Sequence, residues 1–194
     1  MKRSIFIIPL LAVFTASAQV TTPQTSEPAA NSAIRQGNWI VGGSIGSTGF
    51  NFSTETFNLN VNPQAGYFVD DNIAVGAQAI IGLSAYDGGH AFNYGISPFV
   101  RYYFPEGASA TGRWFGEANV GFAGSSYKDS EQDQPVSLLL GIKAGYAHFV
   151  ASNVALETTL GYTYSKADIN ASSGVSGLGV GLGFQIYLPG KRNR

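Results

Sequence analysis

The chain has 194 residues, a formal net charge of −1 and no cysteine, which excludes disulfides, thiol chemistry, cysteine-ligated metals and a lipidated N-terminal cysteine. A charge so close to zero also provides no basic surface for nucleic acid. Charged residues are only 12% of the chain and aromatic residues are 13%, whereas a soluble domain usually has about 25% charged residues. This composition indicates that much of the protein surface does not face water.

Residues 1–18 (MKRSIFIIPLLAVFTASA) have the layout of a secretory signal peptide. Lys2 and Arg3 precede a short apolar stretch, and Ala16-Ser17-Ala18 provides the small-residue cleavage pattern. The alternative is a transmembrane anchor, but the apolar stretch is too short to cross ~30 Å of hydrocarbon as a helix. We therefore expect a signal peptide over residues 1–18. Residues 19–36 are polar and contain proline, so we expect a flexible periplasmic lead-in there.

The rest of the chain, residues 37–188, divides into segments of alternating apolar and small or polar residues. No later stretch is apolar over the roughly 18 residues that a transmembrane helix requires, but each segment reaches the ~9–11 residues of a membrane-crossing strand. Tight breaks alternate with longer polar ones, as short periplasmic turns and longer outer loops do in membrane barrels. The eight segments lie near residues 38–47, 56–69, 73–84, 92–104, 114–125, 136–149, 154–165 and 175–188.

The two-residue period is clearest in the last segment, where Leu178, Val180 and Leu182 alternate with glycines. Apolar residues on one face and small or polar residues on the other suit lipid outside and a hydrated lumen inside. A soluble sandwich or lipocalin-like barrel would carry charges on its polar faces, whereas these faces carry Gly, Asn, Ser and Gln. Lipid also requires every backbone group to be paired within the protein. The pattern therefore predicts an all-β fold, an eight-stranded antiparallel up-and-down transmembrane β-barrel over residues 37–188.

Aromatic residues gather near both ends of the predicted strands on the outward face, as expected of the two interfacial girdles of a membrane barrel. The periplasmic girdle would contain Trp39, Tyr67, Tyr102, Phe104, Trp114 and Tyr146, and the outer girdle Phe57, Phe92, Tyr94, Tyr162 and Tyr164.

Residues 63–76 (PQAGYFVDDNIAVG) and 96–104 (ISPFVRYYF) resemble the small outer-membrane β-barrel family of OmpA/OmpX type, often called porin-like. The resemblance covers residues 37–188 and implies a bacterial outer-membrane location. It implies little about activity, because this family contains adhesins, resistance factors, structural anchors and enzymes. The chain departs from many relatives by ending in a basic periplasmic tail, residues 189–194 (PGKRNR), instead of an aromatic residue.

Four charged residues occupy inward positions on four consecutive predicted strands: Arg101, Glu117, Lys143 and Glu157. Alternating signs on adjacent strands allow these charges to pair, and an unpaired buried charge would cost several kcal/mol. We expect a structural ion-pair cluster in the lumen. The cluster also resembles the interior ion pairs of the OmpA barrel, which implies a gate as the alternative role.

The predicted lumen is asymmetric. Large aromatic residues should close it on the periplasmic side, below the four charges. Gly and Ser in the upper lumen would leave room for water, so we expect a cup that opens to the outside. The closing residues would be Phe68, Tyr103, Phe115, Phe149 and Tyr187, and the upper positions Asn60, Gly95, Ser97, Gly141, Gly177 and Gly179.

Other candidate chemistry is sparse. Ser84, Asp87 and His90 contain the residue types of a hydrolase triad, but Asp87 and His90 flank a glycine pair typical of a loop tip. His148 lies at the periplasmic end of an outward face. The acidic loop at 128–133 could bind cations or a host surface, although a solvated loop is the simpler interpretation. We predict no catalytic residue, cofactor or metal.

These observations predict a non-enzymatic integral outer-membrane barrel with a structural or surface-interaction role. The alternatives are a narrow or gated porin-like channel and a lipid-modifying outer-membrane enzyme. Eight strands leave an interior just wide enough for side chains, which argues against a general pore. The expected partners are outer-membrane lipid, lipopolysaccharide, the barrel-assembly machinery and surface ligands of the outer loops. We expect a monomer.

Overall fold

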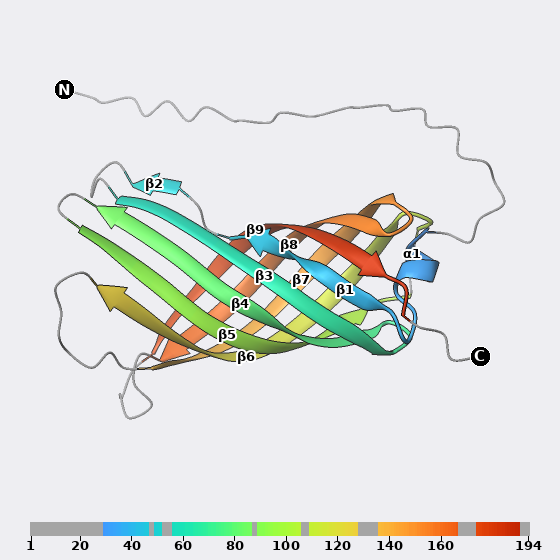
Figure 1. The fold of residues 1–194 in the computed structure, drawn as a ribbon, viewed down its shortest axis with the longest axis horizontal. Helices are drawn as coiled ribbons and strands as arrows, with labels where there is room; N and C mark the ends of the chain where they lie inside the picture. Colours follow the sequence, from blue (N-terminus) through green and yellow to red (C-terminus); the bar gives the residue numbers. More distant parts are fainter. Residues whose placement is uncertain are drawn as a thin grey trace, which may run out of the picture.

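The fold is taken from a computed structural model, and it confirms the predicted barrel (Figure 1). The structure describes residues 29–46, 49–51, 56–86, 89–105, 109–127, 136–166 and 174–190. The predicted signal peptide and the acidic loop at 128–133 lie outside the described residues.

Eight strands form the barrel wall, and they run at an angle to the long axis of the barrel (Figure 1). Their bounds are β1 (Trp39–Ile45), β3 (Thr56–Asp70), β4 (Ile73–Tyr86), β5 (Gly89–Tyr103), β6 (Gly112–Tyr127), β7 (Ser137–Ala151), β8 (Val154–Lys166) and β9 (Val175–Leu188). Consecutive strands pair antiparallel around the wall. This up-and-down order follows from short connections between neighbouring strands.

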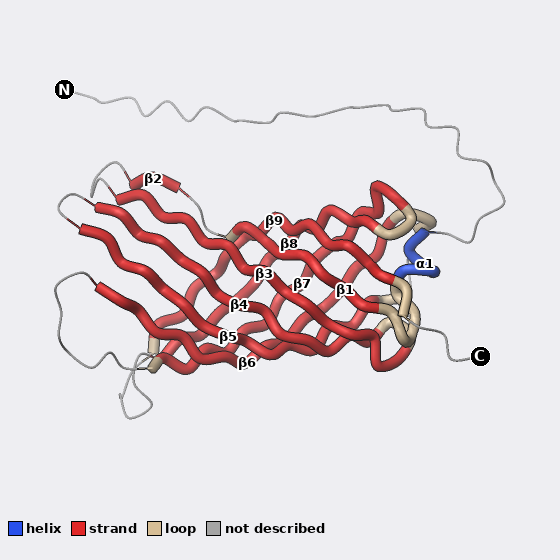
Figure 2. The backbone as a smooth tube through the Cα atoms, viewed as in Figure 1, coloured by secondary structure: helices blue, strands red, loops and turns tan. Residues whose placement is uncertain are grey.

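The first and last strands close the barrel. β1 pairs with β9 from Trp39↔Leu188 to Ile45↔Leu182, and on its other side it pairs with β3. The β3–β4 turn consists of Asp71 and Asn72. Asn72 has a φ of 68°, a left-handed conformation that asparagine tolerates better than most residues. The turns and α1 lie together at one end of the molecule, which is the predicted periplasmic end (Figure 2).

The first strand differs from the expected segment 38–47. β1 ends at Ile45, and a separate strand β2 (Gly49–Asn51) pairs with β3 alone. Gly42, Gly43 and Gly46 all lie in this part of the chain, and glycine weakens a strand interior because it has no side chain to pack. β2 therefore extends the sheet beyond β1 without adding a ninth strand to the closed wall.

The outward face is apolar and uncovered, as predicted. Ile142, Leu182 and Phe184 are 62%, 64% and 47% exposed, and all the aromatic residues of the predicted periplasmic girdle except the half-buried Tyr146 are exposed as well. Inward neighbours on the same strands are buried, including Gln185 and Tyr187. A soluble protein could not keep this many large apolar side chains in water. We call these exposed outward side chains the apolar belt, and it is a lipid-facing surface.

The predicted flexible lead-in is wrong for residues 29–36. α1 (Ala29–Ala33) packs against the periplasmic end of the barrel, with Ala30, Ala33 and Ile34 buried. These side chains join the same buried cluster as Phe68 and Tyr187, so the apolar floor of the lumen orders a segment whose polar composition indicated disorder. In the parts of the chain that the structure describes, no helix is long and apolar enough to span a membrane.

Candidate functional site: the closed lumen

The four predicted lumen charges come together in one cluster, which we call the quartet: Arg101 (β5), Glu117 (β6), Lys143 (β7) and Glu157 (β8). Arg101 is in register with Glu117, and Glu117 is in register with Lys143. Adjacent strands thus bring opposite charges next to each other on the inward face. Arg101, Glu117 and Glu157 are at most 4% exposed.

Arg101 is the centre of the quartet. Its Nη2 lies 2.7 Å from Glu117 Oε2 and its Nη1 lies 2.8 Å from Glu157 Oε1. Lys143 Nζ lies 2.6 Å from the other oxygen of Glu117. Two cations and two carboxylates make the quartet neutral as a whole, which is how buried charges are accommodated in proteins.

Neutral groups complete the cluster. Gln185 Nε2 donates to Glu157 Oε2 over 3.3 Å, and Lys143 Nζ donates to Gln78 Oε1 over 3.2 Å. The Arg101 guanidinium also lies 4.2 Å from the centre of the Phe115 ring, a favourable cation–π distance. Sequence analysis missed these partners, and the only signal that marks Gln78 and Gln185 is their inward position on the strands.

A layer of aromatic residues closes the lumen below the quartet, as predicted. Phe68, Tyr103, Phe115, Phe149 and Tyr187 are all at most 3% exposed. The two tyrosine hydroxyls are 2.9 Å apart and share a hydrogen bond, and Arg101 Nη1 donates to the hydroxyl of Tyr103 over 3.1 Å. The two tyrosines therefore join the aromatic layer to the quartet by hydrogen bonds, and the layer and the quartet form one packed unit.

Three polar contacts of this unit cross the lumen between strands that are not neighbours in the wall. Arg101–Glu157 joins β5 to β8, Tyr103–Tyr187 joins β5 to β9, and Lys143–Gln78 joins β7 to β4. An eight-stranded barrel has room for little more than its own side chains. Together with the buried aromatic layer, these contacts therefore fill the lower lumen with side chains.

The upper lumen is more open. Asn60 is half-buried and Gly177 is exposed, and a Cβ added to Gly177 would meet no atom within 4 Å. Two residues that we expected in this open part are buried instead, namely Ser97 and Gly141. The boundary of the closed region therefore lies nearer the outside than predicted, because strand position alone does not tell how far neighbouring side chains reach.

Glycines on the inward face leave the space that neighbouring side chains occupy. A Cβ added to Gly42 or Gly145 would clash with Gln185 or Phe115, respectively. A Cβ added to Gly141 would lie 2.5 Å from Asn119 Oδ1. At these positions a large side chain on one strand packs into the space left by a glycine on the neighbouring strand.

The other candidate residues do not assemble into a site. Ser84 is in register with Ala91, which is buried, whereas His90 is in register with Ala85 and is exposed; successive residues of a strand face opposite sides of the wall. Asp87 lies outside the described residues, and His148 is exposed. Among the residues that the structure describes, no three His, Asp or Glu side chains are grouped as metal ligands.

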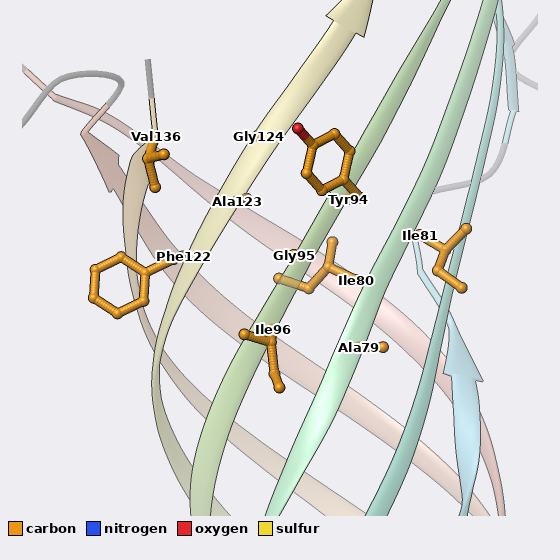
Figure 3. Close-up of a pocket in the computed structure, with 10 residues that line it drawn as sticks. All are labelled: Ala79, Ile80, Ile81, Tyr94, Gly95, Ile96, Phe122, Ala123, Gly124 and Val136. Atoms are coloured by element: carbon orange, nitrogen blue, oxygen red, sulfur yellow. The ribbon is translucent and has the colours of Figure 1, made fainter. Parts of the chain in front are cut away.

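One hollow on the outer face is apolar. It has a volume of about 450 Å³ and lies across β4, β5 and β6, where Tyr94, Ile96 and Phe122 surround the small residues Ala79 and Gly124 (Figure 3). Its large side chains are part of the exposed belt. The hollow therefore belongs to the lipid-facing surface, whereas the polar groups gather inside the barrel.

No protein-family model matches this sequence, and no curated protein matches it by sequence. Solved structures do match. Neisserial surface protein A has 14% identity, with a TM-score of 0.52 over 78% of this chain and 94% of that chain. The outer membrane protein OprG of Pseudomonas aeruginosa has 12% identity and a TM-score of 0.51 over 80% and 97% of the two chains. Ail of Yersinia pestis has 14% identity and a TM-score of 0.50 over 78% and 98%.

The closed wall, the apolar belt and the filled lumen define an eight-stranded transmembrane β-barrel. Its fold is that of small bacterial outer-membrane barrels.

Proposed function

We propose that this protein is a non-enzymatic outer-membrane barrel that stabilises the envelope or presents its outer loops to surface ligands. The observation that carries the proposal is the set of three polar side-chain contacts that cross the lower lumen. A barrel that is filled by its own side chains is suited to a rigid support for loops rather than to solute passage. Outer-membrane lipid, lipopolysaccharide and the assembly machinery are its proposed partners, and a monomer is its proposed state.

Single-channel recording in planar bilayers tests this proposal. The full chain should show no stable conductance steps at neutral pH. A parallel comparison of a deletion strain with its complemented strain should show a defect in envelope integrity or in surface adhesion. Reproducible conductance of the full chain, together with an intact envelope in the deletion strain, would contradict the proposal.

A gated channel is the second candidate, and the position of Lys143 favours it. Its side chain is 23% exposed, whereas the side chains of Arg101 and Glu117 are buried. Conductance that appears in Glu117→Gln but not in the wild-type protein would support a gate. Steps that are absent from both proteins would favour the structural role.

A lipid-modifying enzyme is a weaker alternative, because Ser84 and His90 lie on opposite sides of the wall. Mass spectrometry of lipid A from the deletion and complemented strains tests it directly. Identical lipid A in both strains is the expected result. A modified species that depends on the protein would replace our proposal with an enzymatic function.

A further inference from the structure

The periplasmic mouth of the barrel is filled by residues 29–36 of the same chain. α1 lies across the end of the barrel where the turns gather (Figure 2). Ala30, Ala33 and Ile34 are at most 4% exposed and join the buried cluster that includes Phe68, Phe149 and Tyr187. The segment thus covers the aromatic floor with small and aliphatic side chains.

Polar contacts to the backbone hold the segment in place. Asn72 N donates to the carbonyl of Ile34 over 3.0 Å, and Asn38 Nδ2 donates to the carbonyls of Ser32 and Ala33 over 2.9 and 3.0 Å. At the other end of the segment, Ala30 N donates to the carbonyl of Ala110 over 3.5 Å. The barrel therefore contacts this segment as a binding site contacts a peptide, through main-chain hydrogen bonds and the burial of small apolar side chains.

Arg113 is a polar anchor of the mouth that sequence analysis missed. It is 5% exposed, and its Nη1 donates to the carbonyls of Ser109 and Gly112 over 2.8 and 3.0 Å. Its Nη2 donates to Oδ1 of Asn31 in α1. Because a buried cation needs oxygen partners, removing the segment would take one partner away from Arg113.

We propose that the periplasmic mouth is a peptide-binding site, and that residues 29–36 occupy it in cis and shield the aromatic floor from the periplasm. The preferred ligand has small residues at positions i and i+3 and a branched aliphatic residue at i+4, as in Ala30, Ala33 and Ile34. Only non-covalent contacts hold the segment against the barrel, so its release from the mouth breaks no covalent bond. This site is separate from the quartet, and its test does not depend on the role of the lumen.

A single cysteine provides the test, because the chain has none of its own. Ala147 is fully buried in the cluster that includes Ala30 and Ile34, so Ala147→Cys reports on the floor. In the full chain this thiol should resist a membrane-impermeant maleimide. Deletion of residues 29–36 should raise the labelling rate about tenfold or more, because a buried group reacts only when its cover opens.

A synthetic peptide of residues 29–36 (AANSAIRQ) should restore protection to the deletion variant, while a scrambled peptide should not. Ala151→Cys, at an exposed position by the β7–β8 turn, is the matched control and should label equally in every background. Ile34→Asp in the full chain is a second variant if the deletion does not fold, and the heat-modifiable shift in electrophoretic mobility verifies folding. Two results would overturn the proposal: protection of Ala147→Cys that persists without a docked segment, or a native peptide that protects no better than its scramble.

Discussion

Replacing Arg101 with methionine should be the most damaging single change in the lumen. Glu117 would keep Lys143 at 2.6 Å, but Glu157 would retain only Gln185 and Tyr187 at 3.3 and 3.4 Å. Glu157 is 3% exposed, so its carboxylate would remain buried without a cation. Removal of one partner from a buried ion pair typically costs about 3–5 kcal/mol, and we expect Arg101→Met to lower the free energy of unfolding by that amount.

Urea-induced unfolding in lipid vesicles measures this effect. The double variant Arg101→Met/Glu157→Gln should recover at least half of the lost stability, because the stranded carboxylate is the main source of the cost. Lys143→Met is the matched control. It should cost less than ~3 kcal/mol, since Lys143 is partly exposed and Glu117 would keep its two contacts with Arg101.

Two results would refute this reasoning. One is a loss below about 1 kcal/mol for Arg101→Met, a value typical of an exposed ion pair. The other is a double variant that is no more stable than the single one. Either result would mean that the quartet does not depend on Arg101 as its centre.

Three further substitutions test the packing and the faces of the wall by the same unfolding measurement. Gly145→Ala should lower the free energy of unfolding by about 1–3 kcal/mol, because the added methyl group would overpack against Phe115. Gly116→Ala should be nearly neutral, because the side-chain atoms nearest to the new Cβ are 3.8 Å away. Equal effects of the two changes would contradict the idea that inward glycines make room for side chains on the next strand. Leu182→Arg should lower the free energy of unfolding by about 2–4 kcal/mol, because this residue faces the middle of the bilayer. Leu188→Arg, at the end of the same strand, should lower it by about 1 kcal/mol or less. Asn72→Ala should lower the free energy of unfolding by about 1 kcal/mol, because alanine tolerates the positive φ of this position poorly. Asn72→Gly should not lower it. A loss of stability in Asn72→Gly as well would mean that the asparagine side chain, and not the backbone conformation, stabilises the turn.

The wall and the charges inside it could be predicted from the sequence because a strand has a strict two-residue period. Once Leu178, Val180 and Leu182 are assigned to the lipid-facing side, the residues that alternate with them along β9 must face inward. The same argument placed Arg101 and Glu117 inside the barrel. Because they carry opposite charges and lie on adjacent strands, an ion pair between them could be predicted as well. One physical rule thus accounts for both the fold and the composition of the candidate site.

The contacts across the lumen could not be predicted in this way. Alternation gives the face of a residue but not its height in the tilted barrel, so nothing in the sequence pairs Tyr103 with Tyr187. α1 was missed for a related reason: Ala30, Ala33 and Ile34 are buried by a floor that exists only after the barrel closes. A segment of eight mostly small or polar residues carries no periodic signal of its own.

The contacts that cross the lumen also restrict how this barrel can evolve. Insertion of one more β-hairpin would increase the circumference of the wall, and barrel diameter grows roughly in proportion to strand number. The hydroxyls of Tyr103 and Tyr187, now 2.9 Å apart, would then separate beyond hydrogen-bonding distance, and the Arg101–Glu157 pair would separate with them. A descendant with ten strands would have to replace its interior at the same time as its wall. The lineage is therefore expected to diversify by changing its outer loops at constant strand number.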